Sequence, residues 1–225
     1  MKAKISCIIP AYNEASRIGN VLKVVESHPL LDEIIVVDDG SRDKTREVVK
    51  NFKRVKLIVH KKNKGKTGAV ITGIKACNGD FIMLIDSDLR GLRRQDVTNL
   101  IKPVIENKAQ MSISLRKNTG ILQKLIGIDF ISGERVFHKS FFENFKELNN
   151  VTGYQIESSM NDRIIDKKMT IKVVAWNNVE SPWPSERFGF FKGTIKLVKM
   201  TLEIYKRNGI RGYFYQVYKM HALKV

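Results

Sequence analysis

The 225-residue sequence is poor in cysteine and proline, with two of the first and five of the second. Cys7 and Cys77 stand alone in apolar or small-residue settings, and the absence of CxxC or Cys/His spacing argues against structural zinc and a disulfide framework. No apolar run approaches the ~20 residues of a membrane-spanning helix, and the apolar run in MKAKISCIIP is too short for a signal peptide. We therefore expect a cytoplasmic protein, either free or peripheral at the inner face of the cell membrane.

Acidic residues are scarce beside basic ones: 23 Asp and Glu against 40 Lys and Arg give a net charge of +17. Such a surplus predicts an anionic partner, whether nucleic acid, a phosphorylated substrate or an acidic membrane surface. It is concentrated in residues 42–75, with 12 basic and 2 acidic residues, and residues 185–225, with 9 and 2. A hydrophobic content of 43% is enough for a sizeable core, and the length suits one α/β domain with a short appendage.

Short apolar runs alternate with helical spacing in the first half of the chain. This rhythm predicts a parallel sheet with helices on both faces, in which ligands bind beyond the carboxyl ends of the strands. We expect strands at 5–9, 33–37, 55–59 and 81–85, and helices at 13–27, at 41–51 and at 67–77. The second half is less regular, with expected helices at 96–107, 153–165 and 191–207, strands at 111–115 and 171–176, and a break at 182–185.

Polar clusters occupy the ends of three expected strands, so they should converge on one rim. Asp86-Ser87-Asp88 offers two carboxylates to a hard cation such as Mg²⁺ or Mn²⁺, although a solvated turn would look the same. In Asp38-Asp39-Gly40-Ser41 a carboxylate can accept a hydrogen bond from a nucleobase or ribose, and the motif is also a turn.

Two further segments suit a nucleotide. Tyr12 can stack on a base, and the helix expected after it offers free N–H groups to an anion; capping by Asn13 is the ordinary alternative. Lys64-Gly65-Lys66 precedes a helix and could approach a diphosphate, but it does not match GxxxxGK[ST], and a solvated basic turn remains open.

These motifs together resemble the GT-A glycosyltransferases, most closely family 2, from Ile5 to about Ile165. The resemblance rests on the order and spacing of Ile8-Ile-Pro-Ala-Tyr-Asn-Glu14, Val37-Asp-Asp-Gly-Ser41, Lys64-Gly65-Lys66, Asn78-Gly79-Asp80 and Ile85-Asp-Ser-Asp-Leu89. It implies an α/β GT-A fold with a single Rossmann-like, mostly parallel sheet flanked by helices. Residues 1–180 would form the catalytic domain, with 1–90 binding the nucleotide sugar and 91–180 the acceptor, and residues 185–225 a basic amphipathic tail.

The resemblance also implies a nucleoside-diphosphate-sugar donor, UDP- or GDP-linked, and a divalent cation, Mg²⁺ or Mn²⁺. Asp86 and Asp88 would hold the metal, which would neutralise charge on the leaving diphosphate. The donor-binding residues that it implies are Pro10, Ala11, Tyr12, Glu14, Asp38, Asp39, Lys66, Asp86 and Ser87.

Two groups within the family remain open. Dolichol-phosphate mannose synthase and related polyprenyl-phosphate transferases share the front half, but usually carry Gln where this chain has Arg90; they imply inverting transfer to a lipid phosphate or another membrane-associated acceptor. Glucosyl-3-phosphoglycerate synthases, which retain anomeric configuration, are similar at Gly153-Tyr-Gln-Ile-Glu157 and imply a phosphorylated small molecule as acceptor. Their third metal ligand is a histidine far down the chain, where His221 is placed similarly.

Glu157 is the remaining candidate catalytic residue, beside Asp86 and Asp88. It could act as general base for an alcohol acceptor, although a phosphate acceptor is already ionised and would need none. The alternative is a carboxylate on the surface of a helix. Glu134 and Arg135 could instead position the acceptor, with Arg135 suited to an anion.

The tail carries an apolar row beside a basic one. Phe191, Ile195, Val198, Leu202 and Tyr205 recur at helical spacing, next to Lys192, Lys196, Lys199 and Lys206. Basic amphipathic helices of this kind suit an anionic membrane surface, and the alternative is a helix docked on the catalytic domain.

Functions of other classes are less consistent with these features. A nucleic-acid-binding module would explain the charge but not the three acidic clusters, and no nucleic-acid-binding motif is present. A nucleotidyltransferase would need a Gly-rich loop where Pro10-Ala-Tyr-Asn-Glu14 stands. We therefore expect a glycosyltransferase that does not bind nucleic acid.

Overall fold

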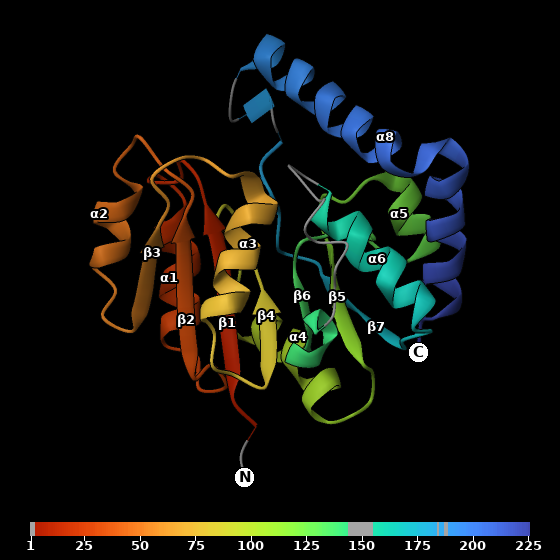
Figure 1. Ribbon diagram of the computed structural model, residues 1–225, viewed down its shortest axis with the longest axis horizontal. Coiled ribbons are helices and arrows are strands. Elements are labelled where there is room, and N and C mark those ends of the chain that lie inside the picture. The colour runs from red at the N-terminus through yellow and green to blue at the C-terminus, as the bar shows by residue number, and fades with distance from the viewer. Residues whose placement is uncertain (1–2, 144–154, 184, 187–188) are drawn as a thin grey trace.

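The computed structural model describes residues 3–143, 155–183, 185–186 and 189–225. Within these residues the chain forms a seven-stranded sheet in the order β3-β2-β1-β4-β6-β5-β7, with helices on both faces (Figure 1). The strands are β1 (Ile5–Ala11), β2 (Glu33–Asp38), β3 (Val55–Val59), β4 (Phe81–Leu84), β5 (Met111–Arg116), β6 (Arg135–His138) and β7 (Ile171–Trp176). The expected α/β class is confirmed.

The sheet is mostly parallel, and β6 is the exception. β1 pairs in parallel with β2 and β4, β2 with β3, and β5 with β7. β6 runs antiparallel to both of its neighbours, β4 and β5. It therefore joins the strands β1 to β4, which precede the Asp86-Ser87-Asp88 motif, to β5 and β7, which follow it.

Two apolar clusters fill the space between the sheet and its helices. β1 shows the alternation that a strand buried on both faces requires: Ile9 packs toward one cluster and Ile8 toward the other. The first cluster includes α1 (Ile18–Glu26), α2 (Thr45–Lys50) and α4 (Arg94–Ile105). The second includes α3 (Gly65–Ala76), α6 (Ile156–Asp166) and the end of α8 (Phe190–Ala222).

Several elements differ from their expected bounds. α1 begins at Ile18 instead of Asn13, because Asn13 has a left-handed backbone (φ 54°) inside a loop. The expected start of α6 at Gly153 lies outside the described residues. Sequence reasoning missed the short helix α5 (Ile121–Ile126), the 3-10 turn η1 (Lys139–Phe142) and β6.

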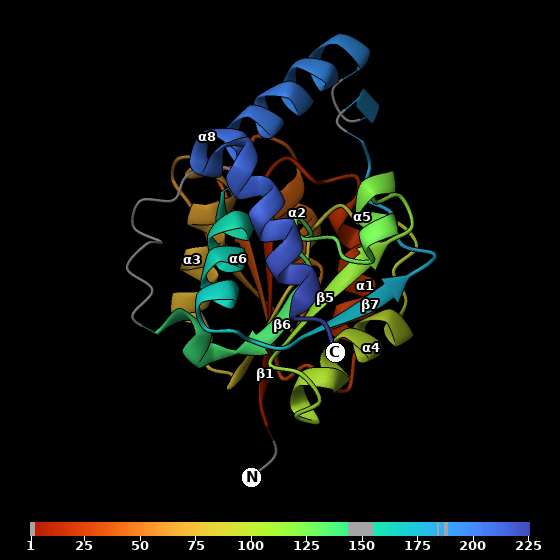
Figure 2. The same ribbon diagram turned by 90° about the vertical axis from the view of Figure 1, so that its right-hand side faces the viewer.

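α8 consists of two helical halves joined at Gly209, which has φ 64° and ψ 174°. The second half lies beside α6 in both Figure 1 and Figure 2 and buries Val217 and Met220. The first half lies beyond the carboxyl ends of the parallel strands, with Phe191, Ile195 and Val198 exposed. Among the described helices, none is both long and apolar enough to cross a membrane.

Candidate functional site

A cavity of about 750 Å³ opens at the carboxyl ends of β1, β2 and β4. This is where a parallel sheet is expected to bind its ligand, and the volume suits a nucleotide-sized molecule. Of the residues predicted from the sequence, it is lined by Pro10, Ala11, Tyr12, Glu14, Asp39, Lys66, Asp86, Ser87, Asp88 and Glu157.

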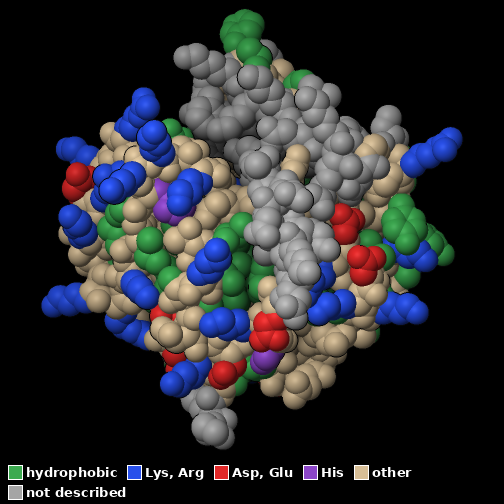
Figure 3. All heavy atoms as spheres, viewed as in Figure 1, with side chains coloured by type: hydrophobic (Ala, Val, Ile, Leu, Met, Phe, Trp, Pro, Cys, Tyr) green, Lys and Arg blue, Asp and Glu red, His purple; other side chains and the backbone are tan. Residues whose placement is uncertain are grey.

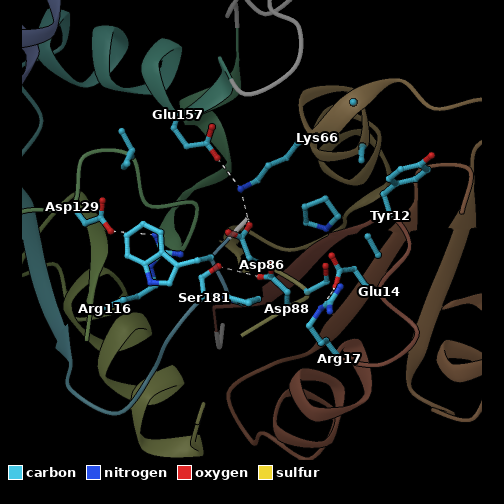
Figure 4. A pocket seen from close by; sticks show the side chains of 18 of the residues that line it. Tyr12, Glu14, Arg17, Lys66, Asp86, Asp88, Arg116, Asp129, Glu157 and Ser181 are labelled. Carbon is cyan, nitrogen blue, oxygen red and sulfur yellow. Dashed lines mark hydrogen bonds and ion pairs between the residues drawn. The ribbon is translucent and has the colours of Figure 1, made fainter. Parts of the chain in front are cut away.

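Asp86 and Asp88 follow β4 and lie at the centre of the cavity (Figure 4). The Lys66 ammonium, from the first turn of α3, lies 2.7 Å from Asp86 Oδ1 and 2.8 Å from Glu157 Oε1. Glu157 lies in the first turn of α6 and is buried, so it is not a carboxylate on a helix surface. The three side chains therefore bridge the two halves of the sheet.

The two motif carboxylates have opposite electrostatic environments. Burial would raise the pKa of Asp86, but the charges of Lys66 and Arg116 outweigh it and hold that pKa below its usual range. Burial and the charge of Asp86 raise the pKa of Asp88 to about 6. Asp88 thus carries an unfavourable charge at neutral pH, which a cation beside it would relieve.

Gly133 makes room for the ion pair between Lys66 and Asp86. A Cβ atom built at Gly133 would lie 2.6 Å from the Lys66 Nζ and 2.9 Å from the Asp86 Oδ1. The glycine is needed here for the close approach of these charged atoms to the backbone.

The donor set at the acidic pair fits a hard divalent cation. Mg²⁺ and Mn²⁺ prefer oxygen ligands, and commonly take one or two protein carboxylates together with substrate phosphates. Asp86 and Asp88 supply carboxylates, and the Ser181 hydroxyl lies 3.4 Å from Asp88 Oδ1. Among the described residues no group of three or more His, Cys, Asp or Glu is placed to hold a metal.

Loops after β1 and β2 are joined to each other and form one wall of the cavity. Asn13 N–H donates to Ser41 Oγ at 2.9 Å, and Arg42 N–H donates to Asn13 Oδ1 at 2.8 Å. Glu14 accepts a hydrogen bond from Arg17 Nε at 2.7 Å. Tyr12, which the same loop holds, has 40% of its surface exposed and its ring at the cavity (Figure 4).

Asp39 is the carboxylate of the β2 turn that reaches the cavity. Its Oδ1 atom lies 2.7 Å from His60 Nδ1 and 2.8 Å from the Lys64 amide nitrogen. His60 follows β3 and is buried, with its Nε2 atom 2.9 Å from Thr72 Oγ1 of α3. Sequence reasoning did not single out His60, because it carries no motif.

Two of the predicted site residues lie elsewhere. Asp38 is fully buried, does not line the cavity, and accepts hydrogen bonds from Arg46 Nε and the Ser41 amide, so its role is to hold the turn. His221 lies near the end of α8, with Nδ1 3.0 Å from the Ile126 carbonyl oxygen. The chain end that follows His221 pairs with Ile171, at the amino end of β7 and the opposite edge of the sheet from Asp88. We therefore do not count His221 among the metal-holding residues.

The second half of the cavity contains a charged group that the sequence did not reveal. Arg116, at the end of β5, donates to Asp129 Oδ2 at 3.2 Å and to Glu134 Oε1 at 3.4 Å (Figure 4). Thr119 Oγ1 donates to the same Asp129 oxygen at 2.8 Å. Arg116 Nε and Asp129 Oδ1 are buried and have no hydrogen-bond partner within the described part of the chain. Such orphaned atoms commonly mark a site that a ligand completes.

Glu134 and Arg135 lie behind the cavity wall and do not line the cavity itself; Glu134 contacts Arg116 there. Both are fully buried, and Glu134 accepts hydrogen bonds from Ser114 and Ser132. Arg135 donates to the Ser132 and Phe130 carbonyls and to Asn161 Oδ1, so each of its three guanidinium nitrogens already bonds to the protein. The expectation that Arg135 binds an acceptor anion is therefore not supported.

Basic side chains gather on one flank of the molecule. In Figure 3, lysine and arginine side chains are dense over α2, β3 and α3, the elements that residues 42–75 form. Lys66 belongs to this stretch and lies in the cavity. The first of the two basic stretches therefore adjoins the site.

Comparisons with known proteins agree with this architecture. The model of the family described as "Glycosyl transferase family 2" matches residues 6–169. The UDP-N-acetylglucosamine--dolichyl-phosphate N-acetylglucosaminyltransferase of Methanococcus voltae is 30% identical over 210 residues, covering 75% of this chain and 82% of that protein. The dolichol-phosphate mannosyltransferase of Pyrococcus furiosus is 34% identical over 118 residues, half of this chain and a third of that one.

Solved structures show the same fold. The glucosyl-3-phosphoglycerate synthase of Mycobacterium tuberculosis, in complex with Mn²⁺, UDP and phosphoglyceric acid, covers 96% of this chain and 78% of its own at a TM-score of 0.73 and 20% identity. A second structure of that protein holds Mg²⁺ and UDP, with a TM-score of 0.72 and 20% identity. At this identity the likeness establishes the fold alone.

Proposed function

Because the chain belongs to glycosyl transferase family 2 and is a glycosyltransferase that uses a nucleotide sugar, we propose that it transfers the sugar to a lipid phosphate with the help of Mg²⁺ or Mn²⁺. The observation that carries the proposal is the position of Asp86 and Asp88 at the centre of the cavity, with Tyr12 on one side and Arg116 on the other. A nucleotide on the first side would present its diphosphate to the acidic pair and to Lys66.

Each donor-side group has a distinct task in this proposal. Tyr12 stacks on the base, Asp39 accepts a hydrogen bond from it, and Lys66 turns toward the diphosphate. Asp86 and Asp88 hold the divalent cation, which when bound supplies Lewis-acid stabilisation of the leaving diphosphate. Pro10, Ala11, Glu14 and Ser87 complete the walls of this subsite.

Arg116 supports the choice of a phosphorylated acceptor. Its side chain lines the cavity and keeps 14% of its surface exposed, so the guanidinium can donate to a phosphate oxygen, a strong charge-assisted contact. The names of the Methanococcus and Pyrococcus relatives include a dolichyl phosphate acceptor, which agrees with this chemistry.

We propose that transfer inverts the anomeric carbon in a single displacement. An ionised phosphate acceptor needs no general base, so Glu157 serves chiefly to hold Lys66. With an alcohol acceptor Glu157 would instead have to accept a proton. Glu157→Gln should therefore lower kcat about tenfold or less with a phosphate acceptor, but by about 100-fold or more with an alcohol.

The first half of α8 supports peripheral binding at an anionic membrane. Phe191, Ile195 and Val198 are exposed on one helical face, and the sequence places lysines at 192, 196 and 199 beside them. A lipid-linked acceptor would enter the cavity from such a surface. Replacing the three apolar residues by serine should abolish flotation with vesicles that contain phosphatidylglycerol, whereas unchanged flotation would contradict this part of the proposal.

The donor and metal requirements are tested by thermal unfolding with UDP, GDP and their sugars, each with and without Mn²⁺. We expect one nucleotide to raise the melting temperature, and more so with Mn²⁺. The Asp88→Asn protein should lose the additional rise in melting temperature that Mn²⁺ causes. The Asp166→Asn protein, changed at an exposed position of α6, should keep it. If no nucleotide stabilises the protein even with metal, the proposal is wrong.

Products identify the acceptor and the stereochemistry. The purified protein is incubated with the stabilising nucleotide sugar and either polyprenyl phosphate or 3-phosphoglycerate, and the products are analysed by mass spectrometry and NMR. We expect a glycosylated polyprenyl phosphate of inverted configuration. A retained configuration on phosphoglycerate would favour the alternative transfer to a phosphorylated small molecule.

A further inference from the structure

The buried His60 contacts one carboxylate oxygen of Asp39, a residue that lines the cavity. Asp39 is at most 4% exposed as a side chain, and its Oδ1 atom accepts from His60 Nδ1 at 2.7 Å and from the Lys64 amide at 2.8 Å. Because a carboxylate oxygen only accepts, Nδ1 must carry a proton in this contact. Thr72 Oγ1, 2.9 Å from Nε2, holds the other side of the ring and fixes its plane.

Counting lone pairs shows what remains for a ligand. Each carboxylate oxygen has two lone-pair sites, and the His60 and Lys64 N–H groups fill both sites of Oδ1. Within the described part of the chain Oδ2 has no hydrogen-bond partner, and it is not sealed from solvent as Asp129 Oδ1 is. Asp39 lines the cavity, so it offers a ligand a single oxygen in a fixed orientation.

A single fixed acceptor discriminates between nucleobases. Uracil presents one N–H, at N3, and matches one oxygen. Cytosine has a bare nitrogen at N3, so it would leave Asp39 facing another acceptor. Guanine presents an N–H and an amino group side by side, which suit both oxygens of a carboxylate, and one of these is already saturated. A site that hydrogen-bonds a particular N–H strongly rejects analogues that lack it.

We propose that His60 is a positioning residue for donor specificity: by saturating Asp39 Oδ1 together with Lys64, it turns the site toward a uracil nucleotide and away from guanine and cytosine nucleotides. This rests on the proposed function, because it assumes that the base of the donor lies at Asp39. His60 does not touch the base itself and acts through Asp39.

The test measures the affinities of UDP, GDP and CDP in the presence of Mn²⁺ by calorimetry. We expect the unmodified protein to bind UDP at least about tenfold more tightly than GDP or CDP. His60→Leu, which removes the donor at similar bulk, should lower UDP affinity about tenfold and bring the three affinities close together. The exposed His138→Leu, remote from the cavity, is the matched control and should keep all three.

A second pair of variants separates positioning from folding. His60→Asn can place its amide nitrogen where Nδ1 lies and should preserve the preference for UDP, whereas His60→Gln reaches toward Thr72 and should lose it. An unchanged preference in folded His60→Gln and His60→Leu proteins would overturn the role of His60. Binding of no nucleotide at all by the unmodified protein would instead refute the proposed function.

Discussion

Asp88 is a carboxylate held where its own charge is unfavourable. It is 5% exposed and beside Asp86, and its pKa of about 6 lies above the ordinary 3.8 because of burial and that neighbouring charge. The folded protein therefore keeps the Asp88 proton at pH values where the unfolded chain has lost it. The contribution of Asp88 to folding stability accordingly falls as the pH rises from about 4 to about 6 and stays low above that range.

We predict that Asp88→Asn stabilises the metal-free protein at neutral pH. The shift in pKa from 3.8 to about 6 corresponds to a gain of about 3 kcal/mol above pH 6, and to none below about pH 4. Chemical denaturation with a chelator at both ends of that pH range measures it. Asp166→Asn should show no such pH dependence, and a destabilised Asp88→Asn protein at pH 7.5 would contradict the electrostatic argument.

Gly133→Ala should separate Lys66 from Asp86 while leaving the fold intact. The new methyl group would lie closer to the Lys66 Nζ than the 3.0 Å that real Cβ atoms keep, and the lysine side chain can move away. We expect a melting temperature within a few degrees of the parent and about a tenfold loss of UDP affinity with Mn²⁺. Unchanged affinity would show that this ion pair is not needed for the donor.

Individual residues on the expected donor side of the cavity could be predicted from the sequence, whereas those on the expected acceptor side could not. Asp86, Asp88 and Asp39 follow strands, so the parallel-sheet pattern alone places them at one edge. Arg116 ends β5 and Asp129 precedes β6, so no such pattern marks them, and they meet because β6 runs antiparallel to β5. His221 was misplaced because position along the chain does not indicate which edge of the sheet its helix ends at.

Among the elements, α8 has two halves with different surroundings. After Gly209 it docks on α6, and before Gly209 it exposes an apolar row. A glycine at φ 64° and ψ 174° permits the bend, because other residues rarely adopt this conformation.

We predict that the two halves of α8 respond differently to mutation. Removing residues 210–225 would take Met220 and Val217 out of the core and break the backbone hydrogen bonds between Ile171 and the chain end, so it should cost on the order of 5 kcal/mol. Serine at positions 191, 195 and 198 should leave the unfolding free energy nearly unchanged. Denaturant titration of both variants checks this, and a mild effect of the truncation would contradict the packing of the second half.

Strand positions were easier to predict than the other elements. The segments 55–59 and 171–176 coincide with β3 and β7, because both are rich in the β-branched and aromatic residues that favour strands, although each is an edge strand with one lysine. β6 is only four residues long and contains the buried Arg135, so it lacks that pattern. α5 exposes Ile121 and Leu125, and apolar residues on the outside of a short helix cannot be told from core residues by spacing.

For the whole molecule, the sheet is continuous across the two expected halves of the catalytic domain. β4 of the first half pairs with β6 of the second, and one apolar cluster joins Ile8, Phe137 and Met220. We therefore predict a single unfolding transition, with circular dichroism in the far and near ultraviolet giving the same midpoint. Two separated midpoints would show that the halves fold as independent units.

Lys66 is the one ammonium group that holds both a donor-side carboxylate, Asp86, and an acceptor-side carboxylate, Glu157, among the ion pairs of the described residues. A cation bound at Asp86 would alter the ion pair between Lys66 and Glu157. A change in the charge or position of Glu157 would in turn alter the ion pair between Lys66 and Asp86. If the substrates bind as proposed, we expect them to be thermodynamically linked, and the factor by which the nucleotide changes acceptor affinity must then equal the factor by which the acceptor changes nucleotide affinity. Neutralising Lys66 should bring that factor toward one.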